Sequence, residues 1–386
     1  MRTSDLSGKK ELRIVGIMNG TSVDGMDFVL CKVLSRFSKK NSAQTSISYL
    51  GHAFAPFSPE MKKRLLLAAQ HQLKVDEIAK LHHDLGRVYS KELQKIATKK
   101  KWKFDAIGLH GQTVFHAPPE ATLQIGEPSY LSKQFQVPVV SDFRTADLAV
   151  GGQGAPIASL FHRVAFQEQF PSQVVSLHNL GGISNLTWID SKGHVKKAFD
   201  TGPANILMDQ YIQKVSRGDL SFDVDGHFAA KGLPLEKVVE QFLQQTKYFH
   251  KKPPKSCGRE EFGKEYLKKV LDQLGPLLPE DKMATLAELT ARSISEAYKD
   301  FCPETPAKVI LCGGGSKNKY LKSRIQYHLP KTEVITTDEA GWPASSIEGA
   351  AFALLAAYRI WEIPSNLPET TGAKKSVTMG KVVEAF

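Results

Sequence analysis

The feature that most constrains the fold is a repeated pattern, in which a strand enters a glycine-rich turn and a second strand returns. In the first copy, residues 12–18 and 26–33 read as strands around the turn at 19–25. In the second copy, residues 174–177 and 186–189 flank a similar turn. The copies begin about 160 residues apart, which predicts a duplicated α/β architecture with a cleft between its halves.

Other segments of the chain fit the same fold class. Ser58, Pro59 and Glu60 have the pattern of a helix start. Apolar residues then recur at spacings of three and four, which predicts an amphipathic helix, at Ile78, Leu81, Leu85 and Val88. Further elements are expected as strands at 106–109 and 308–312 and as a packed helix at 345–359. The join between the halves is expected near 142–156, where Gly151, Gly152 and Gly154 gather.

Composition narrows the class of protein and its partners. The 386 residues include 51 basic and 40 acidic side chains, so the formal net charge is +11. At this charge a polyanion such as a nucleic acid must be considered as a partner. The lysines are scattered along the chain, however, and no nucleic-acid-binding motif accompanies them. The four cysteines form no C-x-x-C pair, and neither a signal peptide nor a membrane-length apolar run is present. We therefore expect a cytoplasmic protein with no nucleic-acid or membrane partner.

The glycine-rich turns are candidates for binding phosphate groups, although neither a Walker A sequence nor G-x-G-x-x-G occurs. The first turn combines glycines, hydroxyls and an acid, at Gly20, Thr21, Ser22, Asp24 and Gly25. Backbone N–H groups and hydroxyls of this kind hydrogen-bond phosphate oxygens, and Asp24 and Asp27 suit a hydrated Mg²⁺. An ordinary β-hairpin explains the same turn. The same two interpretations apply to residues 181–185. Residues 313–318 form a third glycine cluster, whose glycines either let a purine ring lie against the backbone or simply end the strand.

Asp200 is the best candidate for a catalytic residue. It precedes Thr201, Gly202 and Pro203 in a rigid turn, where a carboxylate that is not fully buried suits a general base. The alternative is that Asp200 caps a helix at 204–215. His110 and His116, on either side of Gln112 and Thr113, are candidates for substrate contact or ordinary loop histidines.

Several motifs together resemble one family, the anhydro-N-acetylmuramic acid kinases of bacterial peptidoglycan recycling. The resemblance covers about residues 14–381. The motifs that carry it are Gly20-Thr21-Ser22-Val23-Asp24-Gly25-Met26-Asp27, His110-Gly111-Gln112-Thr113, Thr122-Leu123-Gln124-Ile125-Gly126, Ser141-Asp142-Phe143-Arg144, Gly151-Gly152-Gln153-Gly154-Ala155-Pro156, Asn179-Leu180-Gly181-Gly182-Ile183-Ser184-Asn185, Phe199-Asp200-Thr201-Gly202-Pro203, Lys255-Ser256-Cys257-Gly258-Arg259-Glu260 and Gly313-Gly314-Gly315.

The resemblance implies a two-domain actin-like ATPase fold with ribonuclease-H-like cores and ATP in the interdomain cleft. The expected domains are residues 1–145, with about 365–386 returning to them, and residues 146–364. The implied reaction opens the 1,6-anhydro ring of 1,6-anhydro-N-acetylmuramic acid with water and phosphorylates O6, giving N-acetylmuramic acid 6-phosphate and ADP. ATP and Mg²⁺ are the implied cofactors, and a homodimer is expected.

The resemblance also implies roles for individual residues. Asp200 matches the catalytic base, and Asp24, from the chemistry of the first turn, is the candidate metal ligand. The nucleotide contacts are Gly20, Thr21, Ser22, Val23, Asp24, Gly25, Met26, Asp27, Gly181, Gly182, Ser184, Asn185, Gly313, Gly314, Gly315 and Asn318. The substrate contacts are His110, Gln112, Arg144, Thr201, Gly202 and Glu348.

Departures from the family pattern are Asn19, Glu127, Cys257 and the pair Ser345-Ser346. Asn19 and Glu127 keep the polarity of the usual residue, whereas Ser345-Ser346 replaces a more acidic pair beside Glu348. Two alternatives remain at this point: a kinase of another anhydro sugar such as levoglucosan, and an actin-like or chaperone-like ATPase with a protein partner.

Overall fold

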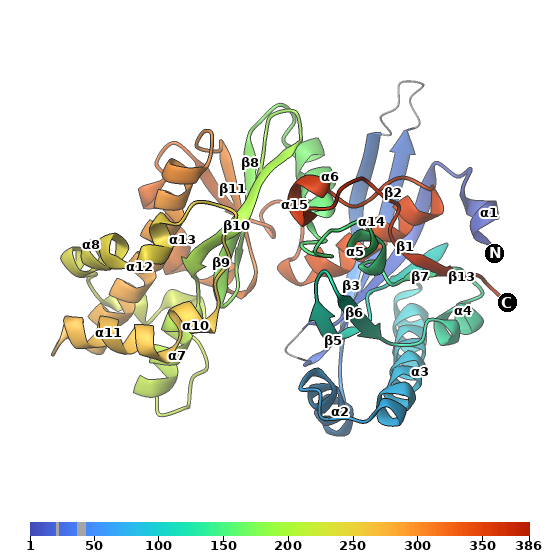
Figure 1. Cartoon of the computed structure of the whole chain (residues 1–386), viewed down its shortest axis with the longest axis horizontal. Coiled ribbons are helices and arrows are strands. Elements are labelled where there is room, and N and C mark those ends of the chain that lie inside the picture. The colour runs from blue at the N-terminus through green and yellow to red at the C-terminus, as the bar shows by residue number, and fades with distance from the viewer. Residues whose placement is uncertain (21–22, 37–43) are drawn as a thin grey trace. The chain divides into compact units, whose positions relative to one another are not determined.

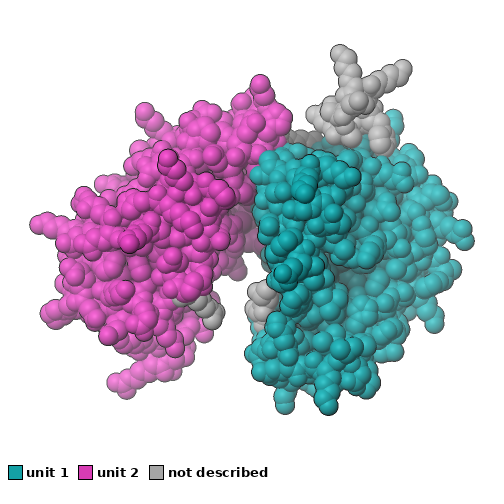
Figure 2. All heavy atoms as spheres, viewed as in Figure 1, with its two compact units in different colours: residues 1–169, 345–386 teal, residues 170–344 magenta. Residues whose placement is uncertain are grey.

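The computed structural model describes residues 1–20, 23–36 and 44–386, so Thr21 and Ser22 of the first glycine turn lie outside the described residues. The chain divides into two compact units (Figures 1 and 2). Unit 1 comprises residues 1–169 and 345–386, and unit 2 comprises residues 170–344.

Unit 1 is built on a mixed sheet with the strand order β13-β7-β4-β1-β2-β3. β1 is antiparallel to β2 and parallel to β4, while β3 is antiparallel to β2 and β7 is parallel to β4. β13 adds an antiparallel edge beside β7. The strands are β1 (Glu11–Met18), β2 (Gly25–Arg36), β3 (Gln44–Pro56), β4 (Ala106–Leu109), β7 (Val139–Ser141) and β13 (Lys381–Val383), and β5 (Gln112–Ala117) pairs with β6 (Ala121–Ile125). The helices are α1 (Thr3–Leu6), α2 (Pro59–Ala69), α3 (Val75–Lys100), α4 (Ser129–Phe135), α5 (Thr145–Ala149), α6 (Ser159–Gln169), α14 (Ile347–Ile360) and α15 (Pro368–Thr371).

Unit 2 repeats this topology with a sheet in the order β10-β9-β8-β11-β12. β8 is antiparallel to β9 and parallel to β11, β10 is antiparallel to β9, and β12 is parallel to β11. The strands are β8 (Val175–Leu180), β9 (Ile183–Ile189), β10 (Val195–Pro203), β11 (Lys308–Cys312) and β12 (Glu333–Thr336). The helices are α7 (Ile206–Val215), α8 (Glu236–Gln245), α9 (Lys247–His250), α10 (Arg259–Phe262), α11 (Lys264–Leu274), α12 (Pro279–Phe301) and α13 (Lys319–His328), with short 3₁₀ turns at Val224–Gly226, Ala229–Lys231 and Gly314–Lys317.

The two sheets share one strand plan. In chain order, the core strands of each unit lie in the order third, second, first, fourth, fifth, with the second strand antiparallel to its neighbours. This is the duplicated ribonuclease-H-like core of the actin-like ATPase fold, so the predicted fold class is confirmed. The helix predicted from Ile78 onward is α3, and Leu81, Leu85 and Tyr89 bury its apolar face in the core of unit 1.

Helix α14 returns to unit 1 although it follows unit 2 in the chain. It packs against β1, β2 and β4, and glycines make the approach possible. A Cβ at Gly16 or Gly108 meets the backbone of α14, and one at Gly349 meets Val29. The expected domain bounds of 1–145 and 146–364 placed this helix and α6 with the second half. The compact units differ from those bounds, because the helix seals a face of the first sheet.

This close approach predicts that Gly16→Ala strongly destabilises unit 1. A methyl group at Gly16 overlaps the carbonyl of Gly349, so the helix must move away from the sheet. We expect a loss of about 3 kcal/mol in the free energy of unfolding, which is the upper end of the usual cost of adding a methyl group to a well-packed core. Chemical denaturation measures it. The matched control is Gly8→Ala, because nothing lies within 4 Å of a Cβ at Gly8; an equal effect of both changes contradicts the packing argument.

Two further observations concern the cysteines and the length of the helices. None of the four cysteines forms a disulfide, as their sparse pattern indicates. Among the helices in the described part of the chain, none is long and apolar enough to cross a bilayer.

Candidate functional site

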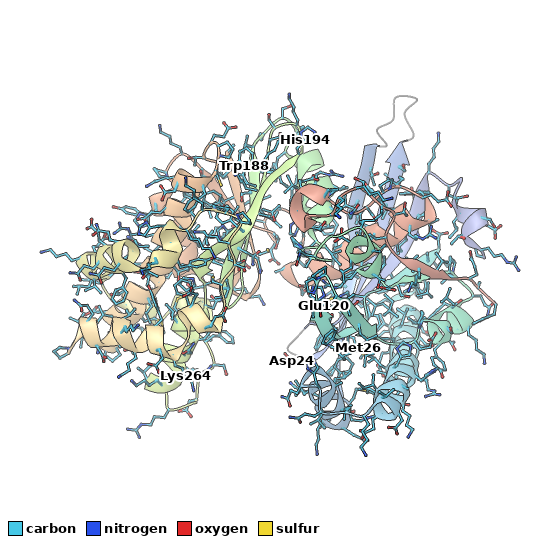
Figure 3. The ribbon with its side chains drawn as sticks, viewed as in Figure 1. Asp24, Met26, Glu120, Trp188, His194 and Lys264 are labelled. Carbon is cyan, nitrogen blue, oxygen red and sulfur yellow. The ribbon has the colours of Figure 1, made fainter. Side chains whose placement is uncertain are left out.

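The turn between β1 and β2 and the first residues of β2 carry two carboxylates that keep contact with solvent and two buried apolar side chains. Val23, which has a positive φ of 54°, and Met26 are buried. A Cβ at Gly25 would overlap β3, so this glycine is required by strand packing. Asp24 is exposed and pairs with Lys62 at 2.5 Å, and Figure 3 labels Asp24 and Met26. Among the described residues of this turn, the side chain of Asp24 is therefore the one that is exposed to a ligand.

Asp27, the second outward carboxylate, lies on β2 beside a residue that the sequence did not single out. The Nε2 atom of His52 on β3 lies 2.7 Å from an oxygen of Asp27. His52 has no motif of its own, and only the pairing of β2 with β3 brings it to Asp27.

Metal binding depends on which side chains are available as ligands. No group of three or more His, Cys, Asp or Glu side chains able to hold a metal ion occurs among the described residues. Mg²⁺ does not require such a group, because it takes one or two carboxylates and completes its shell with water and phosphate. The exposed carboxylate of Asp24 fits that chemistry.

Gln112 is part of a buried hydrogen-bond network rather than of the surface. Its Oε1 accepts a bond from Nδ2 of Asn19 at 2.5 Å, and Oδ1 of Asn19 accepts one from the hydroxyl of Tyr89. Gln112 and Asn19 are both almost fully buried. The departure at Asn19 thus has a structural role, since it joins the first turn to the start of β5.

Arg144 and His110 form a fixed pair. Nε and Nη2 of Arg144 donate to Nε2 of His110 at 3.3 and 3.1 Å, and Nη1 donates to the carbonyl of Gly154 at 2.7 Å. Because arginine has no acceptor, Nε2 of His110 is unprotonated. Burial, followed by the charge of Arg144, lowers the pKa of His110 to about 3, so this imidazole is neutral.

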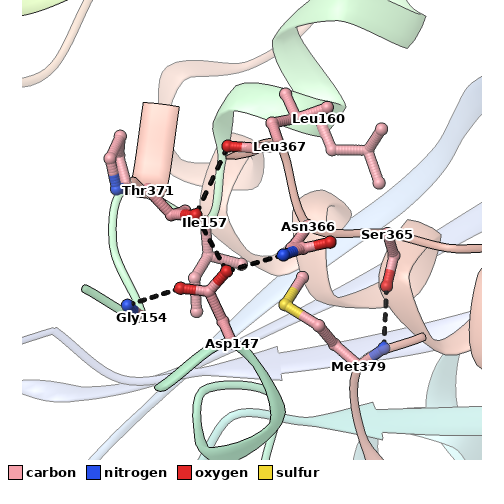
Figure 4. A pocket seen from close by; sticks show the side chains of 10 residues that line it. Asp147, Gly154, Ile157, Leu160, Ser365, Asn366, Leu367, Thr371 and Met379 are labelled. Atoms are coloured by element: carbon pink, nitrogen blue, oxygen red, sulfur yellow. Dashed lines mark hydrogen bonds between the residues drawn. The ribbon is translucent and has the colours of Figure 1, made fainter. Parts of the chain in front are cut away.

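The loop that Arg144 contacts is anchored by a buried carboxylate. Asp147 accepts hydrogen bonds from the backbone N–H of Gly154, Nδ2 of Asn366 and the hydroxyl of Thr371, at 2.7 to 2.8 Å (Figure 4). Asp147 therefore holds the glycine-rich loop at 151–154 in place, and the division between the units lies later in the chain, between residues 169 and 170.

Glu348 lies at the start of α14 and keeps contact with solvent. Its pKa is raised by partial desolvation and by the negative charge of Asp27, against the opposing charge of Arg144. The charges of Asp27 and Arg144 both act on Glu348, and Glu348 acts on Arg144, which makes the three residues one electrostatic cluster in unit 1.

In unit 2, Asp200 lies inside β10 opposite Asn185. The register between β10 and β9 shifts between Asp200 and Gly202, which leaves Thr201 as a bulge. Bulges redirect side chains and are frequent beside active sites. Helix α7 begins later, at Ile206 with Asn205 at its N-cap, so the alternative of Asp200 as a helix cap is not seen.

The carboxylate of Asp200 is half-buried and oriented by a neighbouring loop. Its Oδ2 accepts a hydrogen bond from the backbone N–H of Cys257 at 3.0 Å. Burial raises the pKa of Asp200, and the bond from Cys257 lowers it in part. A raised carboxyl pKa with one lone pair held in place is the environment of a general base. The unusual Cys257 contributes through its backbone here, so the side-chain departure leaves this contact intact.

Ser184 and Thr201 belong to a buried chain of hydrogen bonds. The hydroxyl of Thr201 donates to Ser184 at 2.7 Å, and the hydroxyl of Ser184 lies 2.6 Å from Nε2 of His178. Nδ1 of His178 lies 2.9 Å from the hydroxyl of Tyr298, which donates to Ser176. Since Tyr298 gives its proton to Ser176, His178 carries its own on Nδ1 and accepts from Ser184. Both hydroxyls predicted to contact ligands are therefore engaged inside unit 2.

This chain of hydrogen bonds predicts that His178→Phe destabilises unit 2. The change leaves the hydroxyls of Ser184 and Tyr298 each short of one buried partner, at a cost of about 1–3 kcal/mol per group. We expect the free energy of unfolding to fall by about 3 kcal/mol, as measured by urea denaturation. His227→Phe, at an exposed histidine of the same unit, is the control. A neutral result at His178 contradicts the assigned chain.

The third glycine cluster follows β11. A Cβ at Gly313 or Gly315 would overlap the side chains of Asn179 or Asn205, so these glycines serve packing. Open space surrounds Gly314. Asn318 is the N-cap of α13, because its Oδ1 accepts from the N–H of Leu321 at 2.9 Å. The backbone near Gly314 is the part of this cluster left open to a ligand.

Of the remaining glycines in the predicted site, two leave room for a Cβ and one is tightly packed. Gly181 and Gly182 form the turn between β8 and β9, and a Cβ there meets nothing closer than 3.5 Å. Gly202 has a φ of 146° and packs under the ring of Phe249.

Comparisons with known proteins agree with the motifs. A family model described as Anhydro-N-acetylmuramic acid kinase matches residues 12–385. A protein of that name from Trichormus variabilis is 38% identical, with 96% of each chain covered. Another from Synechococcus elongatus is 35% identical, covering 96% of this chain and 99% of the relative. Among solved structures, the activator of a 2-hydroxyisocaproyl-CoA dehydratase from Clostridium difficile with bound ADPNP matches at 9% identity and a TM-score of 0.44, covering 90% of this chain and 96% of that one. The chain belongs to the anhydro-N-acetylmuramic acid kinase family.

Proposed function

We propose that this chain opens the 1,6-anhydro ring of 1,6-anhydro-N-acetylmuramic acid with water and transfers the γ-phosphoryl group of ATP to O6. The products are N-acetylmuramic acid 6-phosphate and ADP. Family membership supports the substrate and the phosphoryl transfer. The observation that carries the ring-opening step is the half-buried carboxylate of Asp200, held by the N–H of Cys257 and with a raised pKa.

In this mechanism, Asp200 takes a proton from water while the water oxygen bonds to the anomeric carbon. The bond between that carbon and O6 breaks, and its electron pair stays on O6. O6 then attacks the γ-phosphorus, and ADP leaves. One base serves both steps, because O6 becomes nucleophilic only as the bridge opens.

The nucleotide contacts are proposed at the glycine-rich turns. In unit 1 these are Gly20 and the side chain of Asp24. In unit 2 they are Gly181, Gly182 and Gly314, where a Cβ would meet no atom closer than 3.5 Å. Asp24 would hold Mg²⁺, and the ion would offset the negative charge of the phosphates. The partner of Asp24, Lys62, supplies a further cation next to this turn.

The sugar contacts are proposed in the unit 1 cluster. Arg144 is held rigidly by His110 and Gly154, so its cation suits the lactyl carboxylate of the substrate. Glu348 suits a sugar hydroxyl or amide. We assign Gln112, Ser184, Thr201 and Asn318 to positioning rather than ligand contact, because each has a buried partner inside its own unit.

Steady-state kinetics with two sugars test the substrate. We expect a higher kcat/KM for 1,6-anhydro-N-acetylmuramic acid than for levoglucosan, which lacks the lactyl and acetamido groups. The reverse order contradicts the proposal and favours a kinase of another anhydro sugar. ATP turnover that neither sugar changes favours an ATPase with a protein partner. Light scattering tests the homodimer that the family resemblance implies, and cell fractionation tests the cytoplasmic location.

A further inference from the structure

Lys255 is a buried cation beside the proposed base, in the loop between α9 and α10. Only 6% of its surface is exposed. Its Nζ donates to the carbonyls of Tyr248 at 3.4 Å and Phe249 at 3.2 Å. Because these carbonyls belong to α9, the ammonium ties the loop back onto the helix that precedes it.

Aromatic rings from three elements surround the same ammonium. Nζ lies 4.3 Å from the ring centre of Phe301 on α12, 4.9 Å from that of Tyr248 on α9 and 5.8 Å from that of Phe199 on β10. Cation–π attraction is strongest when the cation is shielded from water. Phe199 directly precedes Asp200, so the cage joins the strand of the proposed base to α9 and α12.

Asp200 contacts this clamped segment through three bonds. The backbone N–H of Asp200 donates to the carbonyl of Lys255 at 3.2 Å. The hydroxyl of Tyr248 donates to the carbonyl of Asp200 at 2.8 Å, and the N–H of Cys257 donates to its carboxylate at 3.0 Å. The segment that orients the carboxylate is therefore the one that the ammonium of Lys255 holds in place.

We infer that Lys255 is a positioning residue for Asp200: its caged ammonium fixes residues 248–257 so that the N–H of Cys257 holds the carboxylate ready to deprotonate water. The inference rests on the proposed function, because it takes Asp200 to be the base. In this role Lys255 acts through the backbone of residues 248–257.

The charges around Lys255 set the conditions of the test. Burial lowers the pKa of Lys255 to about 8; Cys257 and Asp300 oppose this shift, and Lys251 adds to it. His250, Glu296 and Asp300 line the small cavity beside Lys255. Asp200 has its pKa raised by burial and lowered by the N–H of Cys257, so weakening the clamp raises it further. The ammonium is protonated throughout the acid range, which makes the acid limb of the pH profile the informative one.

The experiment compares Lys255→Met with Lys252→Met in the full chain. Methionine keeps the length of the side chain and loses the charge and the donors; Lys252 is exposed. We expect Lys255→Met to lower kcat by about 10- to 100-fold, the range for a misplaced catalytic group. The KM for ATP should stay within about twofold, and the acid limb of kcat/KM should move to higher pH. Lys252→Met should match the wild type in all three.

Several outcomes overturn the inference. One is an unchanged kcat in Lys255→Met. Another is a fall that only follows the folded fraction, with no movement of the acid limb, since a purely structural role predicts that. Lys255→Arg, which keeps the cation, should recover part of kcat. If Lys255→Met does not fold, Phe301→Leu removes the nearest ring and should move the acid limb in the same direction; an unmoved limb there rejects the clamp.

A double variant separates this inference from the proposed function. In the Asp200→Asn background, Lys255→Met should lower kcat no further, because the group that it positions is gone. If Asp200→Asn alone keeps activity, the proposed base is wrong. If Asp200→Asn is inactive and Lys255→Met behaves as the wild type, only the positioning role fails.

Discussion

We expect Asp200→Asn to lower kcat by about 10²- to 10⁴-fold, the usual contribution of a general base. Asparagine has nearly the same shape and still accepts the hydrogen bond from the N–H of Cys257, so the loop and β10 stay in place. ATP binding should survive, because the proposed nucleotide contacts at Gly181, Gly182 and Gly314 do not depend on the charge at Asp200.

Two measurements check this prediction. Isothermal titration with ATP should give a wild-type affinity, while the coupled assay for ADP should show the loss of turnover. Asp219→Asn, at an exposed loop of the same unit, is the control and should keep full activity. Near-wild-type turnover in Asp200→Asn removes the carboxylate from the mechanism.

The pH dependence of the wild type carries the same information. As the proposed base, Asp200 must be ionised to accept a proton, and burial raises its pKa above the ordinary value of 3.8. Activity should therefore rise with pH through a midpoint above that value. In Asp200→Asn this acid limb should be absent from the residual activity.

The second large effect is expected on stability, at Glu288 in α12. Its side chain is fully buried and accepts bonds from Nε of Arg324 at 2.5 Å, from Nη2 of Arg324 at 3.0 Å and from His328. Removing one partner of a buried ion pair costs about 3–5 kcal/mol, because the other charge is left without compensation. Glu288→Ala should therefore lose about that much in the free energy of unfolding.

Urea denaturation at neutral pH measures this loss, with Glu265→Ala at an exposed glutamate of unit 2 as the control. The bonds and charges from His328 and Arg324 outweigh burial and hold the pKa of Glu288 below its usual 4.5. Its contribution is therefore present above pH 4.5 and disappears as the pH falls through the lower folded value. A change of less than about 1 kcal/mol would show that the pair contributes as little as a surface pair.

The sequence predicts the strands whose apolar runs are short and bounded. The strands predicted at 106–109 and 308–312 coincide with β4 and β11. β3 was not predicted, because it is half exposed and becomes a strand through its pairing with β2. The return of α14 to unit 1 rests on Gly16 and Gly349 lying face to face, and no local pattern reports a contact so distant in sequence.

The candidate site divides in the same way, between residues that a local motif reveals and residues whose contacts come from distant parts of the chain. The Asp-Thr-Gly-Pro pattern draws attention to Asp200, and the structure gives it a bulged strand and an oriented carboxylate. Ser184 and Gln112 read as ligand contacts in the sequence, since a hydroxyl or amide looks the same whether it faces a ligand or the core. Lys255 was visible only as part of a family motif, because its cage comes from Phe199, Tyr248 and Phe301, which lie far apart in the chain.

The most direct test of the proposed reaction runs it in ¹⁸O-labelled water with ATP and 1,6-anhydro-N-acetylmuramic acid. Mass spectrometry of the sugar phosphate locates the label. Opening of the ring by water places ¹⁸O at the anomeric oxygen and leaves the phosphate ester oxygen at O6 unlabelled. A product without label at the anomeric carbon, or with label only in phosphate, contradicts the account.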